Sequence, residues 1–161
     1  ITMSYKIIVL APSAGGKSTL MRYLRDCSNL EIAETDEEVM KANGDVWPDD
    51  GLKNTVLIPQ TTKQVIKRES IVYLASYIPE ELIKTARDEG FIIVLLDLML
   101  DTLKERNQQR MSTESYADAT PWLQMQLNDF ARLLKSGLID VVIDGNQPVE
   151  VLAKDIVRLA K

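Results

Sequence analysis

The sequence contains no histidine and only one cysteine, and each of these scarcities excludes a class of chemistry. Without histidine the chain has no imidazole ligand for a metal ion, no Ser-His-Asp triad and no histidine acid or base. The single Cys27 excludes an internal disulfide and a cysteine-based zinc cluster. Any chemistry must therefore depend on carboxylates, Lys, Arg, hydroxyl groups or a bound ion.

Basic charge and long apolar runs are also scarce. The 161 residues carry 19 Lys and Arg against 24 Asp and Glu, a net charge of −5, which argues against a surface for nucleic acid. The apolar run 91–96 ends at Asp97 and is far shorter than the roughly 18–20 residues of a membrane span. Residues 1–6 lack the charged region and cleavage site of a signal peptide. We therefore expect a cytoplasmic protein with no membrane or nucleic-acid partner.

Apolar runs alternate with helical patterns along the whole chain, without an internal repeat. The apolar runs predict strands at residues 6–10, 30–33, 71–75, 91–96 and 139–143. Helical spacing predicts helices at about 18–27, 35–43, 61–69, 79–90, 99–111, 121–137 and 148–161. Strands separated by helices imply a parallel sheet with right-handed crossovers and helices on both faces. The sequence therefore predicts a single α/β domain over residues 1–161, a doubly wound three-layer sandwich.

Local patterns predict the roles of two residues and leave one segment unassigned. Cys27 shares a helix face with two leucines, so we expect it in the core, where a free cysteine is usually found. Thr35, followed three residues later by Glu38, forms a capping box and is expected as the N-cap of the next helix. Between residues 45 and 60 the periodicity is weak and breakers such as Pro59 interrupt it, so no element is predicted there.

The strongest motif is the segment Ala11–Thr19, which fits a Walker A loop: a small residue, four further residues, then Gly-Lys-Ser. Small residues let successive backbone N–H groups curl around a phosphate, and the helix that begins here adds the positive end of its dipole. Lys17 is expected to reach the β- and γ-phosphates, and the Ser18 hydroxyl is expected to bind Mg²⁺. The residues predicted to bind the nucleotide phosphates are Ser13, Ala14, Gly15, Gly16, Lys17, Ser18 and Thr19.

A glycine-rich turn with an exposed lysine is the alternative interpretation of this segment. Ala11 departs from the commoner pattern, because a glycine is more usual at the first position. From average residue frequencies, the bare pattern occurs by chance in about one chain of this length in a hundred. The strand predicted before the loop and the helix predicted after it make a phosphate site the favoured interpretation.

With this loop, the chain resembles the small P-loop kinases that phosphorylate nucleotides or small metabolites, the family of adenylate, shikimate and gluconate kinases. The run 95–97 (LLD), followed by 103–106 (LKER) and then Arg110, looks like the fourth strand of that family and the arginine-bearing helix after it. The resemblance implies a sheet order of 2-3-1-4-5, ATP and Mg²⁺ as cofactors, and a small-molecule or nucleotide acceptor. It also implies a substrate-binding insertion at about 37–69 and a lid at about 112–120.

Four residues outside the loop are expected to join Lys17 in catalysis or metal binding. Arg106 and Arg110 share a helix face next to the lid, so one or both are expected to neutralise charge on the phosphoryl group during transfer. Glu34 and Asp36 follow the second strand, where shikimate-type kinases carry an Asp-x-Asp signature. The resemblance implies that Asp36 orients or deprotonates the acceptor hydroxyl and that Glu34 supports Mg²⁺. The alternatives are a solvated basic helix face for the arginines and a capping turn for the acids.

Two absences keep alternatives to a kinase open. Residues 71–76, the third predicted strand and its exit, carry no carboxylate where relatives place a second acid near the metal. The lid segment has no Lys or Arg, unlike the arginine-bearing lids of several relatives. We therefore predict ATP- and Mg²⁺-dependent phosphoryl transfer, with a nucleotide-binding module without transfer activity, or a slow nucleotide hydrolase, as the alternatives. The identity of the acceptor and the oligomeric state stay open.

Overall fold

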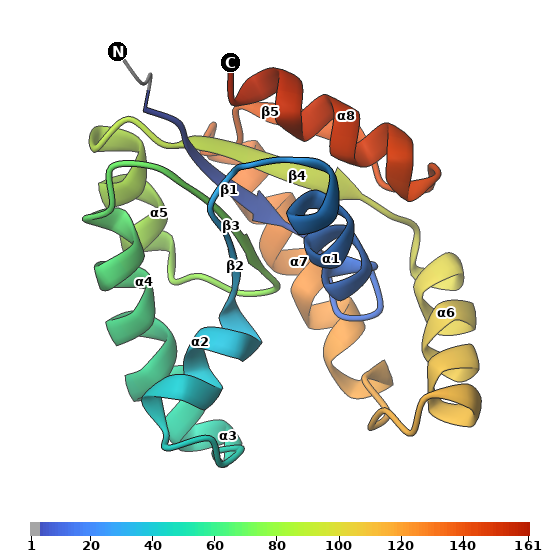
Figure 1. Cartoon of the computed structure of the whole chain (residues 1–161). Coiled ribbons are helices and arrows are strands. Elements are labelled where there is room, and N and C mark those ends of the chain that lie inside the picture. The colour runs from blue at the N-terminus through green and yellow to red at the C-terminus, as the bar shows by residue number, and fades with distance from the viewer. Residues whose placement is uncertain (1–3) are drawn as a thin grey trace.

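Five parallel strands form the centre of the protein in a computed structural model that describes residues 4–161 (Figure 1). The strands are β1 (Lys6–Leu10), β2 (Ile32–Glu34), β3 (Ile71–Ala75), β4 (Ile92–Asp97) and β5 (Val141–Asp144). They are hydrogen-bonded in the order β2-β3-β1-β4-β5, with every pair parallel. This confirms the predicted parallel sheet and its order. The first three residues, part of the segment that lacks signal-peptide features, lie outside the described residues.

Helices cover both faces of this sheet (Figure 1). They are α1 (Lys17–Cys27), α2 (Thr35–Ala42), α3 (Asp50–Leu52), the π-helical turn η1 (Lys53–Leu57), α4 (Ile58–Ile66), α5 (Glu80–Asp88), α6 (Leu100–Thr113), α7 (Thr120–Lys135) and α8 (Val149–Leu159). Among residues 4–161, none of the helices combines the length and the apolar character that crossing a bilayer requires. One face of the sheet packs against α4, α5 and α7, and the other packs against α1 and α8. The protein is therefore the predicted three-layer sandwich.

Strand β1 shows how a single strand supplies both apolar layers. Ile8 and Leu10 pack in the core that contains α5 and α7, whereas Ile7 and Val9 pack in the core beneath α1 and α8. Successive side chains of a strand point to opposite faces, and β1 has a paired strand on each side, so all four are fully buried. Such burial stabilises the fold by about 1.5–3 kcal/mol per side chain. It also places the loop that follows β1 on a rigid support.

The segment 45–60, for which the sequence predicts no element, is largely helical. It contains α3, η1 and the start of α4. Pro59 does not end the helical run: it lies at the start of α4, directly after the wider π-helical turn η1. Leu52 and Val56 are exposed on the short α3 and η1, which explains why the apolar periodicity is weak here.

Two local predictions are wrong. Cys27 is exposed, because it is the last residue of α1 and borders an open groove between α1 and α8. Thr35 is not an N-cap: α2 begins at Thr35 itself, Glu34 occupies the cap position, and no side chain caps the helix. The Thr35 hydroxyl instead donates to the carbonyl of Leu74 in β3 at 3.3 Å. A contact with the neighbouring strand thus replaces the local contact of the capping box.

Candidate active site

A hydrogen bond within its own backbone closes the loop between β1 and α1. The Gly15 N–H donates to the Pro12 carbonyl at 2.9 Å, and a Cβ atom at Gly15 would lie 2.7 Å from that oxygen, so a side chain does not fit there. Ala14 and Gly16 have φ angles of 63° and 88°, in the left-handed region. Left-handed residues in such a turn favour a nest of N–H groups for an anion, and this turn leads directly into the N-terminus of α1. The loop therefore has the backbone geometry of a phosphate site.

Lys17, the first residue of α1, folds back over this loop. Its Nζ donates to the Pro12 carbonyl at 3.1 Å, the one hydrogen bond of this ammonium among residues 4–161. Burial lowers the pKa of Lys17, and the negative charges of Asp36 and Glu34 oppose that shift. A cation that has lost hydration and has few protein acceptors gains strongly from an anionic ligand. The geometry and charge of Lys17 thus suit a phosphate group.

Ser18 and Glu34 bring together two oxygen groups of the kind that Mg²⁺ prefers. The Ser18 hydroxyl lies 3.2 and 3.3 Å from the two carboxylate oxygens of Glu34, which is only 4% exposed at the end of β2. Burial raises the pKa of Glu34, while the charge of Lys17 lowers it. No group of three acidic or cysteine ligands occurs within residues 4–161. The pair therefore fits an Mg²⁺ ion that keeps waters and phosphate oxygens as its other ligands.

Asp36 lies near these groups but is exposed. It follows the end of β2, in the first turn of α2, and forms an ion pair with Lys53 of η1 at 3.5 Å. The Lys53 ammonium also lies 4.6 Å from the centre of the Trp47 ring, a cation–π contact. Asp36 is thus held toward the segment that follows α2.

The two predicted arginines of α6 have different surroundings. The Arg110 guanidinium lies 4.8 Å from the centre of the Tyr116 ring, and its buried Nε has no hydrogen-bond partner among residues 4–161. Arg106 donates to the Asn146 side chain at 3.2 Å, just after β5. Arg106 also lines a smaller cavity of about 270 Å³ with Gly15 and the turn after β5. Arg110 therefore has unused donor capacity near Lys17, whereas Arg106 is tied to Asn146 in the turn after β5.

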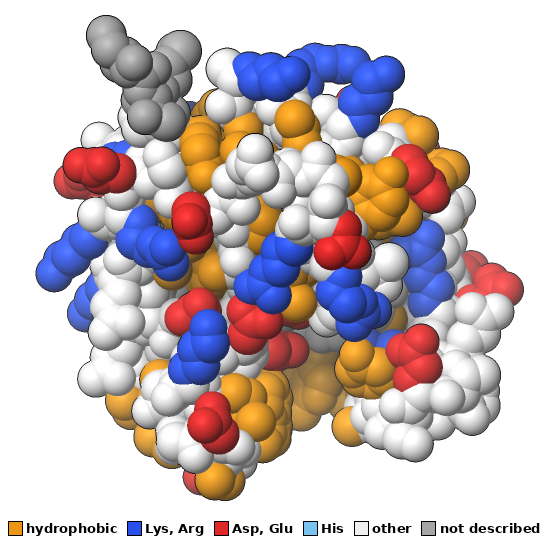
Figure 2. All heavy atoms as spheres, in the orientation of Figure 1, with side chains coloured by type: hydrophobic (Ala, Val, Ile, Leu, Met, Phe, Trp, Pro, Cys, Tyr) orange, Lys and Arg blue, Asp and Glu red, His pale blue; other side chains and the backbone are white. Residues whose placement is uncertain are grey.

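These side chains meet in one open cleft of about 520 Å³, the phosphate-loop cleft. It lies between the part of the chain that carries α2 and α3 and the part that carries the α6–α7 connection, and the surface is hollowed between these two lobes (Figures 1 and 2). Nine of the predicted loop and catalytic residues line it together with Glu34: Ser13, Ala14, Gly16, Lys17, Ser18, Thr19, Asp36, Arg106 and Arg110. Gly15 lines the adjoining 270 Å³ cavity instead.

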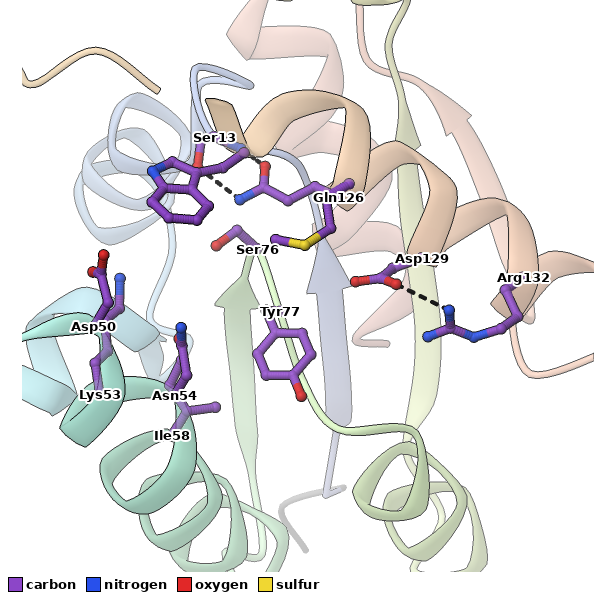
Figure 3. A pocket seen from close by; sticks show the side chains of 12 residues that line it. Ser13, Asp50, Lys53, Asn54, Ile58, Ser76, Tyr77, Gln126, Asp129 and Arg132 are labelled. Carbon is purple, nitrogen blue, oxygen red and sulfur yellow. Dashed lines mark hydrogen bonds and ion pairs between the residues drawn. The ribbon is translucent and has the colours of Figure 1, made fainter. Parts of the chain in front are cut away.

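A second cavity of about 420 Å³, the side cavity, adjoins this cleft (Figure 3). The two share the side chains of Ser13, Lys53, Asp50, Ser76 and Trp122. The remaining wall comes from η1, α4, the exit of β3 and one side of α7. A ligand in the phosphate-loop cleft and a ligand in the side cavity would therefore touch the same boundary residues.

Sequence reasoning missed several residues of this region. Lys53 lies in the segment without readable periodicity, so no pattern marks it. Gln126 lies beside the apolar stripe of α7, and nothing in its neighbourhood indicates that it reaches the loop after β1. Asn107 lies in the middle of α6. Most residues of this helix are polar, so nothing in the sequence marks Asn107 as the buried one. Each depends on a contact between distant segments.

Asn107 ties the end of the α6–α7 connection to α6. It is 1% exposed, its Oδ1 accepts from the Ala119 N–H at 2.9 Å, and its Nδ2 donates to the Asp118 carboxylate at 2.7 Å. Side-chain and backbone hydrogen bonds from Thr120, together with the one from Asn107, lower the pKa of Asp118. The connection predicted as a lid is therefore anchored at its α7 end.

Asn107→Leu is expected to lower the free energy of unfolding by about 1–3 kcal/mol, because the buried Ala119 N–H loses its acceptor. Denaturant unfolding measures this change, and Gln108→Leu, at the exposed neighbouring position, is the matched control with an expected change near zero. Equal stability of Asn107→Leu and the wild type would show that water replaces the contact and that the anchor is dispensable.

The sheet order, the loop between β1 and α1, and the cleft above them define the class: the fold is that of the small P-loop kinases. The structure superposes on a shikimate kinase from Acinetobacter baumannii in complex with shikimate with a TM-score of 0.75, covering 98% of this chain and 93% of that one at 19% identity. A gluconokinase from Sinorhizobium meliloti 1021 gives a TM-score of 0.64, covering 99% and 95% at 17% identity. These comparisons confirm the expected resemblance at the level of the fold.

A sequence comparison points in the same direction. A shikimate kinase of Blochmanniella floridana is 27% identical to this chain, over 66% of this chain and 79% of that protein. No family model matches the chain. The protein is therefore similar in sequence and in fold to small P-loop kinases of metabolites.

Proposed function

We propose that this protein is a cytoplasmic kinase that uses Mg²⁺ and ATP to phosphorylate a hydroxyl group of a small molecule or nucleotide. The observation that carries the proposal is the junction of two cavities that share Ser13, Lys53 and Ser76. A hydrolase needs only water beside the γ-phosphate, whereas a transferase gains from a second cavity that holds the acceptor next to it. The names of the similar proteins, shikimate kinase and gluconokinase, support the same class of reaction.

In this proposal the loop residues bind ATP, and several groups together neutralise the negative charge of its phosphates. The loop N–H groups and Lys17 bind the β- and γ-phosphates, and the Ser18 hydroxyl with Glu34 beside it holds Mg²⁺. Mg²⁺ held there would supply positive charge to the nucleotide phosphates. Arg110, with its free donors, serves the phosphoryl group in transfer, and Arg106 serves the nucleotide near the turn after β5.

The side cavity supports a compact, hydroxylated acceptor. Its two cations already have acidic neighbours: Arg132 pairs with Asp129 at 3.0 Å, and Lys53 pairs with Asp36 at 3.5 Å. The half-exposed indole of Trp122 adds an apolar wall. Polar groups that fix orientation around an apolar surface are typical of sites for small molecules. Shikimate, bound in the Acinetobacter structure, is one candidate of suitable size for a screen.

A coupled assay of ADP release tests the proposal. The protein is incubated with Mg²⁺ and ATP and with single members of a panel of sugars, polyhydroxy acids and nucleoside monophosphates. Release that depends strongly on one acceptor class supports the kinase. Slow release that ignores every acceptor would identify a hydrolase, and ATP binding without any release would identify a nucleotide-binding module.

Asp36→Asn is expected to lower acceptor-dependent ADP release by roughly 10²-fold, because a positioned base contributes about that much to a proton transfer. The affinity for ATP should change little, since Asp36 is assigned to the acceptor. Turnover and ATP affinity are measured for this variant and for Asp88→Asn, an exposed acid at the end of α5 away from the cleft. Turnover at the wild-type level in Asp36→Asn would limit Asp36 to its surface ion pair with Lys53.

A further inference from the structure

The side-chain carboxamide of Gln126 in α7 forms two hydrogen bonds with Ser13 of the phosphate loop (Figure 3). The Ser13 N–H donates to Oε1 of Gln126 at 2.8 Å, and Nε2 of Gln126 donates to Oγ of Ser13 at 3.0 Å. The two residues are 113 positions apart in the sequence. Because the Ser13 N–H is a donor, it fixes which end of the carboxamide faces it, and the opposite orientation would set two donors against each other.

Ser13 lies at the boundary between the two cavities. It lines both the phosphate-loop cleft and the side cavity, while Gln126 lines the side cavity alone. The neighbours of Gln126 on the same side of α7, Trp122 and Asp129, also line the side cavity. Gln126 is therefore the point at which the wall of the side cavity contacts the phosphate loop.

The pattern of donors decides where the Ser13 hydroxyl hydrogen is directed. A hydroxyl group has one hydrogen to donate and two lone pairs that accept. Gln126 occupies a lone pair of Oγ with its own N–H, so the hydroxyl hydrogen remains available, and Ser13 Oγ donates to no acceptor among residues 4–161. Ser13 is thus a held donor at the junction of two cavities, and its hydrogen has no acceptor in the part of the chain that the structure describes.

Resting on the proposed phosphoryl transfer, we propose that the Ser13 hydroxyl donates a hydrogen bond to the phosphoryl group in transfer and that Gln126 is the positioning residue that aims it. In that transfer the acceptor oxygen forms a bond to the γ-phosphorus, and the bond from this phosphorus to the β–γ bridging oxygen breaks. The electron pair leaves with ADP, and the acceptor proton passes to Asp36. Ser13 keeps its proton throughout, because it only donates a hydrogen bond.

The benefit arises because negative charge on the phosphoryl oxygens is spread as the group moves between the two cavities. A donor that is already oriented stabilises this charge without reorganising at the moment of reaction. ADP alone has no group at this place, so its binding does not need the Ser13 hydroxyl. Loss of that hydroxyl should therefore weaken the binding of a mimic of the moving phosphoryl group more than it weakens the binding of ADP.

The test uses Mg²⁺-ADP with and without tetrafluoroaluminate, which imitates the phosphoryl group in transfer, so no acceptor has to be known. Isothermal titration gives the gain in ADP affinity that tetrafluoroaluminate produces. Ser13→Ala and Gln126→Leu are each expected to lower this gain by about 10-fold or more. The gain is a ratio of two affinities of the same variant, so a change in ADP affinity alone does not alter it. Ser13→Thr, which keeps the hydroxyl, should restore most of the gain.

Gln126→Glu tests whether Gln126 orients the Ser13 hydroxyl hydrogen or only connects α7 to the loop. A carboxylate still accepts from the Ser13 N–H, but it also accepts the hydroxyl hydrogen and so removes it from the phosphoryl group. We expect Gln126→Glu to lose the gain as Ser13→Ala does, and to cause no further loss in the Ser13→Ala background. Gln124→Glu is the charge-matched control, because Gln124 is exposed on α7 and bonds only to Asn128 of the same helix among residues 4–161.

Three outcomes would overturn the proposal: an undiminished gain in Ser13→Ala, an unchanged gain in Gln126→Glu, or losses that add fully in the double variant. The last would mean that Gln126 acts by its charge or by holding α7 and not through Ser13. A wild type that binds ADP but gains nothing from tetrafluoroaluminate would also overturn it. Failure of the wild type to bind Mg²⁺-ADP at all would instead refute the proposed nucleotide site, and the inference with it.

Discussion

Lys17→Ala is expected to abolish the stabilisation by Mg²⁺-ATP and to lower acceptor-dependent ADP release by roughly 10²–10³-fold. The stabilisation lost is about 2.7 kcal/mol when ATP is present at a hundred times its dissociation constant. The reason is that Lys17 is the loop's only ammonium and has a single acceptor, the Pro12 carbonyl, among residues 4–161. Thermal unfolding with and without Mg²⁺-ATP measures the first effect, and the coupled ADP assay measures the second.

Without nucleotide, the same variant is expected to be at least as stable as the wild type. Burial lowers the pKa of Lys17 in the folded protein, so between that lowered pKa and its ordinary value the unfolded chain binds more protons. The free energy of unfolding of the wild type therefore rises with pH in this window. At pH values below the window it is lower, because the charged ammonium is then buried in the folded protein. Lys17→Ala should lose this rise, whereas Lys135→Ala, at an exposed lysine of α7, should keep it. An ATP-induced stabilisation that survives in Lys17→Ala would refute the phosphate-loop assignment.

The fold was readable because its signals are local. The run at residues 6–10 is apolar without alternation, since β1 is buried on both faces, and the small residues after it match a loop whose turn excludes a side chain at Gly15. The order of strands and helices follows from such runs, but the sheet order came from the resemblance to P-loop kinases and not from periodicity. The described structure confirms both.

The parts that escaped prediction depend on contacts between distant segments. Thr35 matches a capping box locally, yet its hydroxyl finds a better partner across the sheet in the Leu74 carbonyl. Cys27 has the spacing of a core residue, but the helix ends there and leaves it exposed. Gln126 contacts Ser13 only because α7 returns to the loop after β1. Helical spacing describes one element at a time, so it carries no information on which elements meet.

The roles of the candidate site residues stay predictions, although the residues lie together. Lys17, Asp36 and Arg110 line one cleft, as a shared function requires. The two arginines of α6 offer a direct comparison, since they occupy the same helix and differ in their partners.

Arg110→Lys is expected to lower acceptor-dependent turnover by roughly 10²-fold or more while ATP affinity changes only a few-fold. Lysine keeps the positive charge but lacks the planar fork that meets two phosphoryl oxygens at once. The buried Nε of Arg110 has no hydrogen-bond partner within residues 4–161, and the guanidinium contacts the Tyr116 ring, which indicates a group held ready for an anion. The loss should therefore appear in kcat, because the second oxygen contact matters most as charge spreads during transfer.

Arg106→Lys is the matched comparison on the same helix, one turn earlier. Its contact with Asn146 and its place in the cavity beside Gly15 predict weaker ATP binding with a smaller effect on kcat. Steady-state kinetics with varied ATP separates the two parameters for each variant. If Arg110→Lys and Arg106→Lys both keep the full kcat, the pair is a solvated basic helix face, and the charge of the transferred group must be met by Lys17, Mg²⁺ and the loop N–H groups alone. If Arg106→Lys loses kcat and Arg110→Lys does not, the roles are exchanged, and the contact with Asn146 must break when nucleotide binds.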